Sequence, residues 1–126
     1  MRLIAVLIAA AALCGCSRTS EYPVCAVKNV TLIDGSGRPP VAPATVVVRD
    51  GKVEAMGELS SVTIPPEATV FDGTGKYVFP LDPAMPLRVG GAADLLLLRV
   101  NPAVEPGYMK MAAGKMQDGR WIQYPQ

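Results

Sequence analysis

Short strand-like runs broken by Asp-Gly pairs constrain this chain more than any other feature. Residues 45–49 and 52–56 form two such runs on either side of Asp50-Gly51. A two-residue hairpin turn needs positive φ at both central positions, which Gly adopts freely and Asp tolerates. The pattern therefore predicts a β-hairpin here. Residues 27–34 also alternate, and they predict a strand that ends at the Gly- and Pro-rich loop 35–40.

Two further hairpins are predicted later in the chain. The first would pair residues 69–72 with residues 76–79 around Gly73-Thr74-Gly75, where the glycines favour a turn. The second turns at Asp118-Gly119 into residues 120–124. Both add antiparallel strands to the expected fold.

Residues 94–100 contain four consecutive leucines, Leu95–Leu98, and end at Asn101-Pro102. Such a run suits a strand buried on both faces, although periodicity alone does not distinguish it from a buried helix. Residues 108–116 are open between helix, which Met, Lys and Ala favour, and strand. With about seven short strands and closely spaced turns, the expected fold class is all-β, a small antiparallel β-sandwich or flattened barrel.

The N-terminus has the layout of a signal peptide. Arg2 supplies a positive charge, and the apolar run 3–13 is shorter than the roughly 20 residues needed to cross the hydrocarbon core of a membrane. The following Leu13-Cys14-Gly15-Cys16 resembles the lipobox of bacterial lipoproteins, in which the last Cys is acylated and becomes the mature N-terminus. The predicted organisation is a signal peptide over residues 1–15, a lipidated tether over 16–25 and one domain over 26–126.

Acylation of Cys16 would hold the protein on membrane lipid, since each buried methylene contributes about 0.8 kcal/mol. Ser17 after this Cys favours an outer-membrane lipoprotein facing the periplasm, rather than the inner membrane, by analogy with Gram-negative sorting. The alternative is an ordinary secretory signal cut nearby, which would leave Cys16 as a free thiol. If Cys14 leaves with the signal peptide and Cys16 carries lipid, Cys25 has no intramolecular disulfide partner. A small buried apolar role is favoured for it over an intermolecular bridge.

Several segments resemble the amidohydrolase superfamily of metal-dependent hydrolases. They are residues 27–35, 45–53 and 70–80, the last containing GTGKYVFP, and then GAADLLLLRVNP over 91–102 and residues 118–121. In that family the two ends of the chain build a small composite β-sandwich, and the segment between them builds a (β/α)₈ barrel that holds the metals. The resemblance implies the sandwich alone, with a strand over 112–117, because a barrel of this kind takes about 250 residues.

The family's chemistry uses divalent metals held mainly by histidines and an aspartate, yet this chain contains no histidine. The family's His-x-His motif would fall just after Pro80, where Leu81-Asp82-Pro83-Ala84 stands instead. We therefore predict no catalytic residue, no metal site and no cofactor. Four aspartates precede glycine and are interpreted as turn residues rather than as an acid–base pair: Asp34, Asp50, Asp72 and Asp118.

The expected function is that of a non-catalytic lipoprotein whose sandwich serves as an interaction or structural module. Loss of the barrel would uncover an apolar flank, and such patches mark surfaces for a protein partner or for self-association. The predicted surface comprises Leu81, Met85, Leu87, Met109, Met111 and Met116, with core filling as the alternative for the methionines. Two other hypotheses stay open: the sandwich subunit of a split amidohydrolase acting on non-peptide C–N bonds, and a remnant of an amidohydrolase gene. Without Arg2 the chain has 11 basic residues, one fewer than its 12, against 11 acidic ones, which argues against nucleic acid.

Overall fold

The computed structural model describes residues 22–126, and in that range every regular element except one short 3-10 helix is a strand. The elements are β1 (Val24–Leu32), β2 (Val41–Arg49), β3 (Lys52–Glu58), β4 (Thr69–Asp72), β5 (Tyr77–Pro80), β6 (Leu95–Leu98), the 3-10 helix η1 (Tyr108–Met111), β7 (Ala112–Gln117) and β8 (Arg120–Gln123). The predicted all-β class is confirmed. Within these residues no helix is long and apolar enough to cross a membrane. The predicted signal peptide and Cys16 lie outside the described residues.

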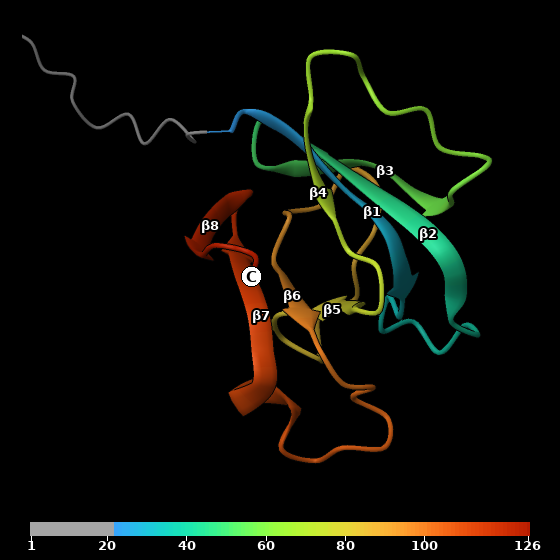
Figure 1. Cartoon of the computed structure of the whole chain (residues 1–126), viewed down its shortest axis with the longest axis vertical. Helices are drawn as coiled ribbons and strands as arrows, with labels where there is room; N and C mark the ends of the chain where they lie inside the picture. The colour runs from blue at the N-terminus through green and yellow to red at the C-terminus, as the bar shows by residue number, and fades with distance from the viewer. Residues whose placement is uncertain (1–21) are drawn as a thin grey trace, which may run out of the picture.

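The strands form one hydrogen-bonded sheet in the order β3-β2-β1-β5-β6-β7-β8, with β4 also paired to β1. Figure 1 shows β7 and β8 on one side of the molecule and β2 and β3 on the other, with β5 and β6 between them. The sheet folds over a common core in the manner of a sandwich and does not close into a barrel. It is mixed rather than wholly antiparallel, because β4 and β5 both run parallel to β1. β1 begins at Val24, so the last two residues of the predicted tether belong to the sheet.

The predicted hairpin around Gly73-Thr74-Gly75 is wrong, although both of its strands exist. β4 and β5 do not pair with each other; they follow one another along the same edge of β1. The changeover coincides with Asn29, which has a φ of 65° and interrupts the register of β1. The Gly73 backbone N–H donates to the Lys28 carbonyl (2.8 Å), and the Asn29 side-chain amide donates to the Thr74 hydroxyl (2.8 Å). These bonds bind the glycine turn to the irregularity in β1, so the chain continues in its original direction.

The irregularity at Asn29 also keeps apolar side chains of β1 facing the core. Before it the inward residues are Cys25 and Val27, and after it they are Val30 and Leu32. Strand side chains alternate between the two faces, so an uninterrupted strand would have turned one of these pairs away from the core.

The other two predicted hairpins are confirmed. Asp50 and Gly51 have φ values of 51° and 85°, and Asp118 and Gly119 have φ values of 51° and 75°. The two turns also lie against each other, since a Cβ placed on Gly119 would stand 2.4 Å from the Cα of Gly51. Ala93 joins them, because its N–H donates to the Gly51 carbonyl (2.9 Å) and its carbonyl accepts from the Gly119 N–H (3.0 Å). Contact between the two halves of the chain therefore requires glycine on both sides.

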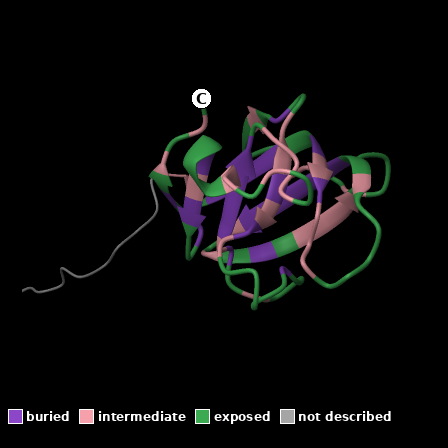
Figure 2. Cartoon of the chain, turned by 90° about the horizontal axis from the view of Figure 1, so that it is seen from below, coloured by how far each residue is buried: buried purple, intermediate pink, exposed green. Residues whose placement is uncertain are grey.

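The main core lies between the two halves of the sheet. It contains valines of β1, β2 and β3 together with Leu95 and Leu97 of β6, Met116 of β7 and Trp121 of β8. Figure 2 shows the buried positions gathered on the strands and the exposed ones in the loops. All four residues of β6 are fully buried, which confirms the strand with two covered faces. Residues 108–116, open between helix and strand, contain both η1 and most of β7.

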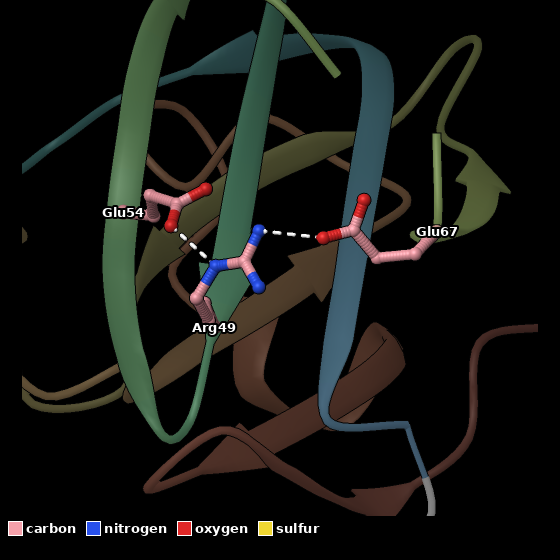
Figure 3. A network of polar contacts seen from close by, with 3 residues as sticks. All are labelled: Arg49, Glu54 and Glu67. Atoms are coloured by element: carbon pink, nitrogen blue, oxygen red, sulfur yellow. Dashed lines mark hydrogen bonds and ion pairs between the residues drawn. The ribbon is translucent and has the colours of Figure 1, made fainter. Parts of the chain in front are cut away.

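A group of three charged side chains fastens the loop before β4 to the first hairpin. Arg49 donates through Nε to Glu54 (2.5 Å) and through Nη2 to Glu67 (2.9 Å), as Figure 3 shows. A hydrogen bond from its own backbone N–H, and then the one from Arg49, lower the pKa of Glu67. All three side chains are at least a third exposed, so these ion pairs contribute little to stability. They orient the loop rather than hold the fold together.

We predict that Gly119→Ala destabilises the protein more than Gly75→Ala does. Both glycines have similar positive φ, 75° and 79°, but Gly75 has open space around its Cα. Both substitutions should lose about 1–2 kcal/mol because alanine disfavours this conformation. Gly119→Ala should lose about 1–3 kcal/mol more, because the new methyl group collides with Gly51. Urea unfolding of the two variants measures the difference, and equal losses would contradict a close contact between the turns.

Candidate interaction surface

The six residues predicted for an interaction surface divide between core and surface. Leu87 and Met116 are buried, with 4% and 0% exposure, so their prediction as surface residues is wrong. Met116 pairs with Leu95 in the sheet, and both side chains face the main core. The Leu87 N–H donates to the Asp34 carbonyl (2.8 Å), which holds the Leu87 side chain over the same core. Core filling, the alternative considered for the methionines, therefore holds for Met116.

The other four residues are accessible. Met85, Met109 and Met111 are exposed by 68%, 46% and 42%. Leu81 is half-buried and packs in a second apolar cluster, separate from the main core. The structure brings Leu81 together with this cluster. Met85 lies in residues 81–86, called here the bridge, which connect the two sequence blocks that resemble the amidohydrolase superfamily, residues 26–80 and 88–122.

This second cluster, called here the outer apolar cluster, is built on Leu96, Leu98 and Ala112, with Tyr77, Phe79, Leu81 and Tyr108 packed against them. Leu96 and Leu98 alternate with the core-facing Leu95 and Leu97, so they point to the opposite face of β6. Tyr77 and Phe79 pair with Leu98 and Leu96 in the neighbouring strand. The cluster therefore lies on the outside of the sheet.

A thin layer of residues covers the outer apolar cluster. Tyr108 opens η1, and its ring meets Phe79 edge-on with centroids 5.5 Å apart. Tyr77, Phe79, Leu81 and Tyr108 all remain partly exposed. Met109 and Met111 follow Tyr108 on η1 and are exposed, with Lys110 between them. This face consequently presents partly exposed aromatic groups to solvent, and the exposed side chains of Met109, Lys110 and Met111 follow directly on η1.

The aromatic residues of the outer apolar cluster were missed in the sequence. A usable signal was present, because Tyr77, Phe79 and Leu81 recur at every second position and the neighbouring leucine run needs cover on both faces. Val78, between the first two, is fully buried in the main core. A strand such as β5, with apolar side chains on both faces, indicates a second apolar cluster on the outer face of the sheet. The number of methionines alone does not indicate one.

The residues at the bridge do not fit the metals that the family resemblance implies. Asp82 stands where the His-x-His motif would fall, and its carboxylate accepts the Ala84 N–H (2.9 Å) to close a local turn. Among residues 22–126 no group of three or more His, Cys, Asp or Glu side chains is placed to hold a metal ion. A depression of about 400 Å³ beside the bridge includes Asp82, Arg88 and Asp94 in its lining. Asp94 there accepts the Asp118 N–H (2.7 Å) and is thus committed to the turn.

The four aspartates that precede glycine act as turn residues. Asp34 accepts hydrogen bonds from the Ser36 N–H and hydroxyl at 2.9 and 2.6 Å. Asp72 accepts the equivalent pair from Thr74 at 3.0 and 2.6 Å. The hydroxyl of Thr74 and then its N–H lower the pKa of Asp72. Asp50 and Asp118 occupy the positive-φ positions of their hairpins. This agrees with the turn interpretation made for all four.

The comparisons with known proteins find only partial likenesses. No protein-family model matches the chain, and no curated protein matches it. A solved molinate hydrolase is 33% identical over 48% of this chain and 13% of its own, with a TM-score of 0.43. Phenylurea hydrolase B is 38% identical over 45% and 12%, with a TM-score of 0.42. An N-acyl-D-glutamate deacylase from Bordetella bronchiseptica is 36% identical over 44% and 11%, with a TM-score of 0.36.

These proteins are members of the amidohydrolase superfamily that the sequence motifs resemble. The chain spans only 11–13% of their length. A likeness of this extent is local, and by itself it fixes neither the fold nor an activity of this protein.

Cys25 is a buried free thiol, with 0% exposure on the inward face of β1. Burial raises the pKa of this thiol from its ordinary value of 9.0 to about 11. A thiol in this state is a poor nucleophile, because the thiolate is the reactive form. The residue fits the predicted role as a small apolar member of the core.

We predict that the Cys25 thiol makes stability fall between about pH 9 and pH 11. In this window the folded chain keeps the thiol proton that the unfolded chain has lost, so ionisation of the thiol favours unfolding. Below pH 9 both states hold the proton, and the thiol does not reduce stability. The loss should amount to roughly 2–3 kcal/mol. Urea unfolding at several pH values measures it, with Cys25→Ala as the control that lacks this component. Parallel pH curves for the two proteins would show that the thiol is solvated in the folded state.

Proposed function

We propose that the protein is a non-catalytic, membrane-anchored bacterial lipoprotein whose amidohydrolase-like sandwich binds a protein partner. The observation that carries the proposal is the outer apolar cluster, where Phe79 and Tyr108 are only partly covered, together with the exposed methionines that follow Tyr108 on η1. Aromatic and methionine side chains are enriched at protein interfaces. Apolar clusters that are exposed to solvent often mark interaction sites.

The partner surface expected from this chemistry has an apolar centre. Methionine adapts its shape to irregular partner surfaces, and Tyr108 adds a rigid anchor with a polar tip. Lys110 between the two methionines favours a carboxylate on the partner opposite η1.

The absence of catalysis is proposed on the chemistry of the chain. Hydrolysis in the family that the sequence resembles requires metals that are held mainly by histidine side chains, and this sequence contains no histidine. The direct pairing of β5 with β6 joins the two sequence blocks into one sheet across the short bridge. This supports a self-contained module more than a sandwich that needs a barrel chain to fold.

Anchoring rests on the lipobox-like Leu13-Cys14-Gly15-Cys16. We predict that Cys16→Ser moves the protein from the outer-membrane fraction to the periplasm or leaves an unprocessed precursor, because acylation at this position would be lost. Membrane fractionation and intact-mass analysis of the wild type and the variant measure this. Cys25→Ala, which changes a buried thiol, is the control and should keep the wild-type fraction. A wild-type protein without acyl mass would refute the anchor.

We predict that Met109→Glu combined with Met111→Glu abolishes partner binding without unfolding the chain. Both residues are exposed, so the free protein should keep its melting temperature, while two carboxylates placed in an apolar interface should weaken binding at least about tenfold. Val104→Glu, on the preceding loop at 76% exposure, is the matched control. Cross-linking in detergent extracts followed by quantitative mass spectrometry compares the three proteins.

The same experiment separates the alternatives. A cross-linked chain that carries His-x-His and lacks both sandwich blocks would favour the split amidohydrolase. Partners that cross-link equally to all three proteins would refute the outer apolar cluster as the binding site. Bound zinc and hydrolysis by the purified protein alone would refute the proposed lack of catalysis.

A further inference from the structure

Tyr22, the first described residue, fixes the place where the predicted tether reaches the sheet. Its ring packs edge-on against Phe71 of β4, with centroids 5.5 Å apart, and against Tyr124 beyond β8, at 6.0 Å. Phe71 in turn meets Trp121 of β8 at 5.2 Å. Four aromatic rings thus join the start of the described chain to β4 and to the C-terminal strand.

Apolar side chains also point outward at the C-terminal end of the chain. Trp121 faces inward, so its neighbour Ile122 lies on the opposite, outer side of β8. Ile122 is 59% exposed, and Tyr124, which follows β8, is 47% exposed. We call these two residues the tether-proximal patch. Arg120, two positions before Ile122, is exposed on the same side of β8.

The length of the predicted tether limits how far this patch can lie from an anchored Cys16. Five residues lie between Cys16 and Tyr22, which makes six steps along the chain. A fully extended chain advances about 3.3–3.6 Å per step, so the separation is at most about 22 Å. A bilayer that holds the acyl chains is therefore within reach of β4 and β8.

We propose that the tether-proximal patch rests on the lipid surface and thereby orients the sandwich on the membrane. The inference rests on the proposed acylation of Cys16. Tyrosine is favoured at the membrane interface, where its ring lies among apolar groups and its hydroxyl stays hydrated. Arg120 beside the patch can pair with lipid phosphate. The patch is small, but a short tether gives it a high effective concentration at the bilayer, so weak contact suffices.

This orientation leaves the outer apolar cluster accessible. The loop between β6 and η1 lies at the end of the molecule away from the start of β1, as Figure 1 shows. A protein seated through the tether-proximal patch would direct that loop toward the periplasm.

Site-specific labelling of the acylated full-length protein tests the proposal. Ile122→Cys and the control Val104→Cys each place a thiol at an exposed position. An NBD maleimide should react there alone, since Cys16 would carry lipid and Cys25 is buried. The labelled proteins are reconstituted in vesicles of phosphatidylethanolamine and phosphatidylglycerol, with or without spin-labelled lipid. We expect a blue shift and lipid-dependent quenching for the label at 122, and neither for the label at 104.

The outcomes distinguish the inference from the function on which it rests. Equal emission and equal quenching at both positions, in protein whose mass shows the acyl chains, would overturn the orientation and leave the anchor intact. Protein without acyl mass would overturn both. Melting temperatures equal to that of the wild type establish that the two labelled variants are folded, so a negative result counts against the proposal.

Discussion

Burial of the run Leu95–Leu98 is the constraint on which this architecture depends. Four consecutive leucines in a strand place two side chains on each face, so both faces of β6 must be covered. The valines of β1, β2 and β3 cover one face and give the main core its depth. The other face is covered by Ala112, Leu81 and the aromatic residues of β5 and η1, most of which remain partly exposed. The half-covered outer apolar cluster is therefore a direct consequence of how this chain buries one strand.

The two sequence blocks are held together at two further places. β5 pairs with β6 through all four residues of each strand, directly across the bridge. The two Asp-Gly turns meet at Gly51 and Gly119, with Ala93 hydrogen-bonded to both. The Asp-Gly pair thus has two roles in this chain. It makes each hairpin turn, and because glycine has no side chain, the two turns can come into contact. The second role depends on long-range packing and not on local conformation.

Much of the fold was predictable because its signals are local. Positive φ at Asp50-Gly51 and Asp118-Gly119 follows from residue type, and the leucine run indicates a strand with two covered faces. The pairing of β4 and β5 with β1 was not predictable in this way, because it depends on Asn29, whose positive φ no periodicity reveals. The surface was predicted in part. Methionine type alone did not separate Met116, which is fully buried, from Met109, which is exposed. Met116 is buried because it pairs with the core-facing Leu95, and that pairing is not visible from residue type.

The bridge joins the two sequence blocks through local contacts of its own. The turn at Asp82 satisfies its own carboxylate through the Ala84 N–H, and Leu87 returns the chain to the core within a few residues. Neither feature needs a metal to stabilise it. The sheet is consequently continuous across the bridge, from β5 to β6. In the function that we propose, the outer apolar cluster binds the protein partner and the tether-proximal patch at the end of β8 contacts lipid, so the two contacts use different surfaces.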